Sequence, residues 1–349
     1  MKEMSLEDLY NTPPIPATQE IPTEIQDLLK PSSGVYVRSQ YEPKLDFAIE
    51  NVPGVPEMWQ VSSCSHDEEL LTTIPGEEQI ELKTKDILEE KEDVSRTEGY
   101  RPPWQPLEYL PRLVPFRVGE QVFLEPRATE EGRRLSFPFN TIGLVKVNGT
   151  PAGTGVLVGP NLILTAGHVA PWGAKNWSME FIPAFRQGDV KPPFGSSFVQ
   201  RFRGYNTKGE ASGHDYVICK LFKPLGKALG FLGTQSFGSE KEYYKRRYVS
   251  TGYPDKFNNR PAVEFDMGLR DIDNDSPGIE LEFSHSGHPD IRQGWSGGPL
   301  WIPGPGATST VFGICSGSEK DEFDPRFIVF AGGKGMVDLV KFGLANWGV

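Results

Sequence analysis

The strongest candidate for chemistry in this sequence is the serine in the stretch GWSGGP, residues 294–299. A serine with glycine close on both sides can be held in a sharp turn, with its hydroxyl exposed as a nucleophile. Backbone N–H groups in such a turn can stabilise the oxyanion that forms when the hydroxyl attacks a carbonyl carbon. Surface turns rich in Gly, Ser and Pro are also common. Ser296 therefore gains this role only with a base and an acid beside it.

A histidine is the expected base, and residue order restricts which one it can be. The serine motif matches G-x-S-x-G, the nucleophile elbow of α/β-hydrolases, but those enzymes place their histidine after the serine. No histidine follows Ser296. His168 is the best candidate, because the apolar stretch LILTAGH carries it from a strand into a turn of small residues. His66 falls in an acidic region, and we interpret His285 and His288 as polar groups of a loop.

Asp215 is the candidate for the orienting acid. The stretch GHDYVICKLF places it immediately before an alternating apolar strand, where a carboxylate can be partly buried. Such a carboxylate can accept the imidazole N–H, fix the tautomer and stabilise the imidazolium. Most junctions of this kind are only turns, so Asp215 depends on His168 and Ser296 for its significance. We expect the adjacent His214 to face solvent.

Short strands are the elements that must position these side chains. From about Val118 onward, runs rich in Val, Ile, Leu and Phe alternate with Gly, Pro, Asn and Asp turns, a pattern typical of an antiparallel all-β architecture. The stretch VLVGPNLILT predicts a hairpin with residues 159–161 at its tip. Helical spacing of apolar residues predicts one helix over 335–347, with a single apolar face. That face holds Met336, Val337, Val340, Leu344 and Trp347.

The N-terminal third has a different composition. Residues 1–130 carry 12 basic and 26 acidic residues, whereas 131–349 carry 36 − 12 = 24 basic and 47 − 26 = 21 acidic residues. Residues 1–115 are rich in Pro, Glu, Asp, Ser and Thr, so we predict a largely disordered tail or pro-segment. The remainder is close to neutral, which gives no electrostatic case for nucleic acid.

Cysteine content and hydropathy argue against disulfide-rich, metal-binding and membrane-spanning proteins. Three irregularly spaced cysteines form neither a disulfide framework nor a metal-binding signature. No apolar run approaches the length that spans a bilayer. The acidic start shows no secretory signal, which leaves the compartment unknown and cytoplasmic by default. We expect no metal, cofactor or membrane partner.

Three blocks in this order resemble the active-site blocks of chymotrypsin-family serine proteases: TAGH (165–168), HDYVICKL (214–221) and GWSGGP (294–299). Two further stretches are similar to the glutamyl-endopeptidase-like branch of that family. These are VSTGYPDK (249–256) and VFLEPRATEEGRRLSFPFNTIGLV (122–145). The resemblance covers roughly residues 118–349.

The resemblance implies roles for the candidate residues. Ser296 becomes the nucleophile, His168 the general base and acid, and Asp215 the orienting acid. The N–H groups of Gly294 and Ser296 become the oxyanion hole. The stretch GICSG (313–317) becomes the edge strand whose backbone pairs with an extended substrate. The substrate-binding residues on it are Cys315, Ser316 and Gly317.

The resemblance also implies an architecture. It consists of two six-stranded antiparallel β-barrels, over about 118–225 and 245–333, with the site between them. A C-terminal helix (335–347) closes the domain. The whole protease domain would occupy 116–349, after the acidic segment 1–115.

Some positions depart from the family pattern. Trp295 stands where trypsin-like zymogens carry an aspartate that captures a new N-terminal amine, so we do not expect that route of activation. Glutamyl-specific members have His where this chain has Cys315 and Thr where it has Ile291, which argues against glutamate selection.

Asp290, six residues before Ser296, has two possible roles. It is either the floor of a pocket that selects Arg or Lys, or a carboxylate paired within its loop. A preference for small or apolar residues also stays open.

The leading hypothesis is a serine endopeptidase that works through an acyl-enzyme. One alternative is a catalytically silent, peptide-binding homologue, since fold does not fix activity. Another is an esterase or acyltransferase that uses the same three residues. For the endopeptidase we expect protein or peptide substrates and a monomer.

Overall fold

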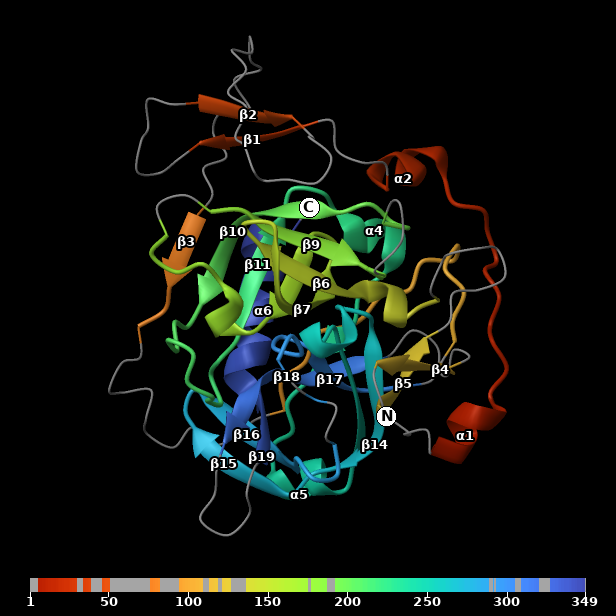
Figure 1. Ribbon diagram of the computed structural model, residues 1–349, viewed down its shortest axis with the longest axis vertical. Coiled ribbons are helices and arrows are strands. Elements are labelled where there is room, and N and C mark those ends of the chain that lie inside the picture. The colour runs from red at the N-terminus through yellow and green to blue at the C-terminus, as the bar shows by residue number, and fades with distance from the viewer. Residues whose placement is uncertain are drawn as a thin grey trace.

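Figure 1 shows two β-sheet units, one above the other, and the C-terminal helix packs against strands of both. The computed structural model describes residues 6–29, 34–38, 46–50, 76–81, 94–108, 113–118, 121–126, 136–174, 177–186, 192–288, 291, 293–304, 309–319 and 327–348. Within these residues, no helix combines the length and the apolar character that crossing a bilayer requires.

The upper unit is a closed barrel of six antiparallel strands. These are β6 (Ile142–Val147), β7 (Thr150–Gly159), β8 (Leu162–Thr165), β9 (Met179–Pro183), β10 (Ser197–Gly204) and β11 (Val217–Leu221). Their order is β11-β8-β7-β6-β9-β10, and β10 pairs with β11 to close the ring. The predicted hairpin is present, as β7 and β8 pair across a tip at Pro160 and Asn161. β3 (Gly76–Gln79) adds to the barrel as a strand parallel to β10.

The lower unit is a second antiparallel sheet. Its strands are β13 (Arg247–Gly252), β14 (Ala262–Gly268), β15 (Asp271–Asp275), β16 (Gly278–Ser284), β17 (Pro299–Ile302), β18 (Thr310–Glu319) and β19 (Phe327–Gly332). They follow the order β14-β13-β17-β18-β19-β16-β15, and β12 (Gly233–Thr234) pairs with β18 in parallel. Among the described residues, no ladder joins β14 to β15. β15 instead follows β14 after only Leu269 and Arg270, so the two act as one bent strand that pairs with β13 and with β16 and completes the expected second six-stranded barrel.

The helices and short turns complete the two units. The predicted C-terminal helix is present as α6 (Lys334–Trp347), which buries Met336, Val337 and Val340. α4 (Leu225–Leu229) and α5 (Glu240–Tyr244) lie between the units in sequence, and three short 3₁₀ turns cover 139–141, 167–169 and 255–257. Asn161 at the hairpin tip donates to the carbonyl of Trp347 at 2.9 Å, which ties α6 to the barrel. The chymotrypsin-like fold predicted from the sequence is confirmed.

Before the barrel, the chain forms separate short elements. These are α1 (Leu6–Asn11), α2 (Thr23–Leu28), a hairpin of β1 (Gly34–Arg38) with β2 (Asp46–Glu50), and a hairpin of β4 (Leu113–Val118) with β5 (Gln121–Pro126). The domain boundary near residue 115 stays a prediction, but residues 94–108, which precede it, pack against the protease domain. The side-chain amide of Gln105, 2% exposed, donates to the Ala228 carbonyl on α4 at 3.0 Å. Ser95 Oγ donates to Asp338 on α6 at 3.1 Å.

Candidate active site

His168 lies in a 3₁₀ turn, Gly167–Val169, that follows directly after strand β8. The strand ends in the buried barrel wall, so the turn carries the imidazole to the barrel rim, where its side chain is 23% exposed. The Trp172 indole N–H donates to the Gly167 carbonyl at 2.7 Å and holds the turn in place. The ring is therefore fixed at its base and accessible at its outer edge.

Asp215 stands just before strand β11, and it is fully buried. Its Oδ2 lies 2.7 Å from His168 Nδ1, and its Oδ1 accepts the backbone N–H of His168 at 2.9 Å. Two hydroxyls also donate to it, Thr207 Oγ1 to Oδ1 at 2.9 Å and Ser316 Oγ to Oδ2 at 2.6 Å. These bonds offset the cost of burying a carboxylate. Because Nδ1–H donates to Asp215, His168 Nε2 is left as the acceptor nitrogen.

Ser296 sits in a turn that two glycines make possible. Gly294 and Gly297 have φ angles of +91° and +83°, in the left-handed region that favours glycine. The turn is fastened to strand β18, since Gly297 N donates to the Cys315 carbonyl at 2.8 Å. It is also fastened to the first barrel, since Thr154 N donates to the Ser296 carbonyl at 2.7 Å. A side chain at Gly297 would collide with the Thr154 carbonyl, so the packing itself requires glycine there.

Trp295, beside the nucleophile candidate, anchors the turn from below. The indole is fully buried, and its Nε1 donates to Ser250 Oγ on β13 at 2.9 Å. The side chain thus occupies core space at the position where trypsin-like zymogens have an aspartate. At residue 295 itself, packing and one neutral hydrogen bond therefore hold the turn, where those zymogens use an ion pair.

Two backbone N–H groups of the turn are available as donors. In the part of the chain that the structure describes, the N–H groups of Gly294 and Ser296 donate to no acceptor. Within the same residues, no hydrogen bond joins Ser296 Oγ to His168. Such catalytic hydrogen bonds are often long without substrate and tighten in the reactive complex. The serine turn nevertheless lies against the segment that leads to His168, because a Cβ placed on Gly297 would lie 2.9 Å from the Ala166 nitrogen.

A cavity of about 450 Å³ opens beside the Ser296 side chain. Its lining includes two of the predicted substrate-binding residues, Cys315 and Gly317. The other lining residues are His285, Ile291, Gln293, Ser296 and Ser318. The sequence interpretation of His285 as a loop polar group missed this position. Ile291 and Cys315 give the cavity an apolar wall, and the remaining side chains give it a polar one.

Ser316, the third predicted substrate-binding residue on β18, does not line this cavity, because its side chain lies beside Asp215 and Ser212. A register shift in β18 falls between Cys315 and Gly317. The Ser316 hydroxyl accepts the Ser212 N–H at 3.2 Å and donates to Asp215. No described strand pairs with the far side of β18 beyond Cys315, so residues 316–319 form an edge without a strand partner there.

Two other expectations from the sequence have different outcomes. Asp290 and Arg292 lie outside the described residues, as does His66. His288, two residues before Asp290 in the same loop, has its Nδ1 3.3 Å from Glu264 Oε2. The expectation that His214 faces solvent is wrong. Its side chain is 15% exposed, and its Nδ1 lies 2.8 Å from Asp275 Oδ2.

Comparison with known proteins gives one family and several relatives. A family model described as Trypsin matches residues 128–332. Over 89 residues the chain is 37% identical to exfoliative toxin A of Staphylococcus aureus, a match that covers 24% of this chain and 31% of the toxin. The chain thus spans less than a third of the toxin's length.

Solved structures with a similar fold include three proteases. A Glu endopeptidase in complex with MPD has 19% identity and a TM-score of 0.46, covering 60% of this chain and 93% of that one. The protease Anisep from Arthrobacter nicotinovorans has 17% identity and a TM-score of 0.40, covering 56% and 91%. The thermostable serine protease AL20 from an extremophilic microorganism has 16% identity and a TM-score of 0.43, covering 58% and 95%.

Proposed function

Because the chain belongs to the trypsin family of serine proteases, we propose that it is an endopeptidase that hydrolyses peptide bonds through an acyl-enzyme on Ser296. The observation that carries this proposal is the buried Asp215 carboxylate, 2.7 Å from His168 Nδ1, beside a glycine-shaped serine turn. This arrangement leaves a basic nitrogen, a hydroxyl and free N–H groups around one point.

In the first half of the reaction, His168 Nε2 takes the proton from Ser296 Oγ as Oγ attacks the peptide carbonyl carbon. The N–H groups of Gly294 and Ser296 donate to the resulting oxyanion. Asp215 keeps Nδ1–H in place and stabilises the imidazolium. The same proton then passes from Nε2 to the peptide nitrogen, the C–N bond breaks, and the amine product leaves.

The second half repeats these steps with water. His168 Nε2 takes a proton from water as the water oxygen attacks the ester carbon of the acyl-enzyme. When the tetrahedral intermediate collapses, the proton returns to Ser296 Oγ and the acid product leaves. The water supplies both the hydroxyl of that acid and the proton that regenerates the enzyme, so the cycle closes.

The substrate in this proposal is an extended segment of a protein or peptide. The edge of β18 beyond Cys315, with which no described strand pairs, supports it, because an extended backbone can pair there as an added strand. The side chain before the scissile bond would enter the cavity lined by Ile291 and Cys315. Such pairing needs one copy of the chain only, so we expect a monomeric enzyme. We expect no nucleic-acid or membrane partner.

Alanine at each reacting residue tests the proposal. Ser296→Ala and His168→Ala should each lower kcat/KM on a peptide substrate by about 10⁴-fold or more, because the residues act as a unit. The double variant should be little worse than either one. The matched control is Ser239→Ala, at an exposed serine before α5, which should leave kcat/KM unchanged. Peptidase activity above about a tenth of the parent in Ser296→Ala would contradict the mechanism.

Two further assays separate the alternatives. A fluorophosphonate should label the parent chain and not Ser296→Ala, whereas a silent homologue would not be labelled at all. Cleavage of a peptide library then distinguishes a peptidase from an esterase, and it reports the side chain preferred before the scissile bond.

A further inference from the structure

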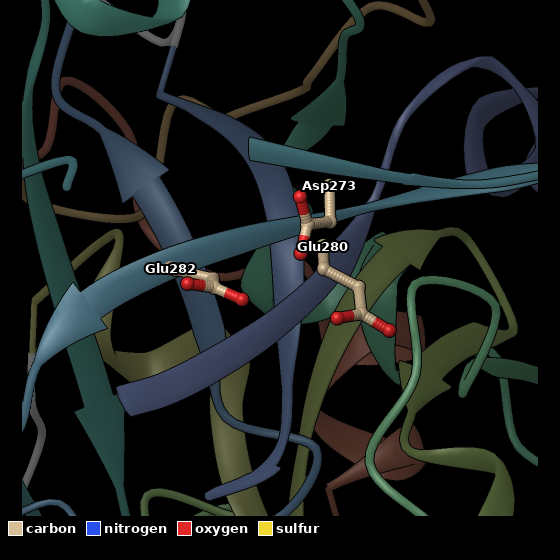
Figure 2. A group of neighbouring side chains, drawn as sticks. All are labelled: Asp273, Glu280 and Glu282. Atoms are coloured by element: carbon tan, nitrogen blue, oxygen red, sulfur yellow. The ribbon is translucent and has the colours of Figure 1, made fainter. Parts of the chain in front are cut away.

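Three carboxylates converge on one face of the hairpin formed by β15 and β16. Asp273 and Glu280 are directly opposite in the register of this hairpin, and Glu282 lies two residues further along β16. Side chains two apart on a strand share a face. One oxygen from each of the three carboxylates lies within 4.8 Å of the others. Figure 2 shows them gathered at the hairpin.

Glu282 is the unusual member of this group. The residue is only 5% exposed, and in the described part of the chain its carboxylate has neither a hydrogen bond nor an ion pair. A buried carboxylate without a partner is costly. Burial, with Asp273 and Glu319 nearby, raises the pKa of Glu282 to about 7. Burial also raises the pKa of Glu280 to about 7. Acids directly opposite one another add repulsion to this cost, and within the described residues no cation forms an ion pair with any of the three carboxylates.

We propose that Asp273, Glu280 and Glu282 bind a calcium ion. Three carboxylate oxygens are the donors that hard divalent cations prefer. Two oxygens on one Ca²⁺, each at about 2.3–2.6 Å, can lie up to about 5 Å apart, whereas Mg²⁺ limits them to about 4 Å. Because Ca²⁺ accepts flexible geometry, oxygens that lie within 4.8 Å of one another can close on it with small shifts. Asp273 is exposed on the edge strand β15, which leaves one side of the site open for water ligands.

The site is also connected to the segment that carries Asp215. Glu280 Oε1 accepts the Gly213 N–H at 3.1 Å, and Asp275 Oδ2 accepts the same N–H at 2.9 Å. A cation that fixes Glu280 would therefore fix the backbone two residues before Asp215. Binding itself does not depend on the chemistry at Ser296, so it can be measured whatever the outcome of the activity assays.

Isothermal titration of CaCl₂ into the chelator-treated full chain tests the site. We expect one saturable site with a Kd of about 10⁻⁴–10⁻³ M, as for exposed calcium modules. Glu282→Gln and Asp273→Asn should each weaken binding at least tenfold. The matched control is Asp271→Asn on the same face of the hairpin. Its carboxylate accepts from the Tyr244 hydroxyl, and Asp271→Asn should keep Kd within about threefold.

The melting temperature gives a second readout. If the three carboxylates had only a structural role, Tm would not depend on calcium. In chelator, Glu282→Gln should melt above the parent, because it removes an unpaired buried charge. Calcium should raise the Tm of the parent and leave that of Glu282→Gln unchanged. Asp273→Asn, at an exposed position, supplies the same comparison if Glu282→Gln does not fold.

Three results would overturn the proposal. The first is no saturable heat up to 10-fold above the expected Kd range, and the second is an equal Kd for the parent and Glu282→Gln. The third is binding of MgCl₂ as tight as that of CaCl₂, which would remove the assignment to calcium.

Discussion

At the scale of single residues, the Asp215 carboxylate collects the most hydrogen bonds of the site. It accepts from the ring and the backbone N–H of His168, from Thr207 and from Ser316. These donors come from three separate segments, so the carboxylate cannot rotate without breaking several bonds. The hydroxyls of Thr207 and Ser316 donate to Asp215 and form no hydrogen bond with Ser296. In the proposed mechanism their role is therefore to position Asp215.

Removal of the hydroxyl donors should slow the chemical step. We expect Thr207→Val to lower kcat about tenfold with KM unchanged, because one charge-assisted bond, worth roughly 1.5–3 kcal/mol, no longer orients Asp215. Thr207→Ser should restore kcat, since it returns the hydroxyl. Steady-state kinetics on one peptide substrate measure both parameters. A rise in KM at constant kcat would contradict the positioning role.

The three residues of the proposed triad can be picked out from the sequence, whereas the residues that support Asp215 cannot. Ser296, His168 and Asp215 stand in local patterns that already indicate a turn or a strand end. Thr207 reaches Asp215 across a loop, and Ser316 reaches it from 101 residues away. No local pattern encodes such a contact. His214 was misplaced for the same reason, because its partner Asp275 lies on a distant hairpin.

At the scale of elements, strand β7 fastens the serine turn to the first barrel. Thr154 on β7 uses its hydroxyl twice, donating to the Gly294 carbonyl at 2.9 Å and accepting the Tyr253 N–H at 2.9 Å. The residue is fully buried. One side chain of the first barrel therefore satisfies two backbone groups of the second sheet, at the point where the two units meet.

Thr154→Val keeps the shape of the side chain and removes the hydroxyl. It leaves two buried backbone groups unpaired, so we expect the free energy of unfolding to fall by about 1–3 kcal/mol per unpaired group, with reduced activity. Urea denaturation measures the change. Thr150→Val, at the exposed start of the same strand, is the control and should stay within about 0.5 kcal/mol of the parent. Equal effects of the two substitutions would contradict this account.

Helices and strands with a long apolar pattern are easier to predict from the sequence than strands at the edge of a sheet. Helical spacing predicts 335–347, and α6 runs Lys334–Trp347. β3 has the sequence GEEQ, which shows no apolar alternation, and it becomes a strand because β10 offers it a free edge. The pairing of β12 with β18 likewise depends on a long-range contact, which a local pattern does not contain.

At the scale of the whole molecule, residues 94–108 join parts of the fold that are distant in sequence. They contact α4 through Gln105, α6 through Ser95 and the barrel through Leu107, which is 1% exposed. Gln105 also accepts from the buried Asn140 side chain at 3.0 Å. The acidic N-terminal third therefore ends in a segment that behaves as part of the domain surface.

Two truncated chains test this attachment. A chain that starts at residue 109 should melt at least about 5 °C below one that starts at residue 94. The removed segment takes with it a buried leucine and several hydrogen bonds, together worth a few kcal/mol. Differential scanning calorimetry measures both chains. Equal melting temperatures would show that residues 94–108 contribute nothing to stability, as expected for a dispensable tail.

The Trp295 anchor has a consequence for the timing of activity. Some proteases are inactive until their chain is cut, because the serine turn forms only when the new N-terminus inserts beside it. Here the turn is held by an indole and Ser250, both internal to the fold. With the proposed function, the chain becomes competent at the moment it folds, and any latency must come from outside this turn. Control then rests on whatever covers the cavity, and the segment predicted as a tail or pro-segment, residues 1–115, is the part of the chain that could do so.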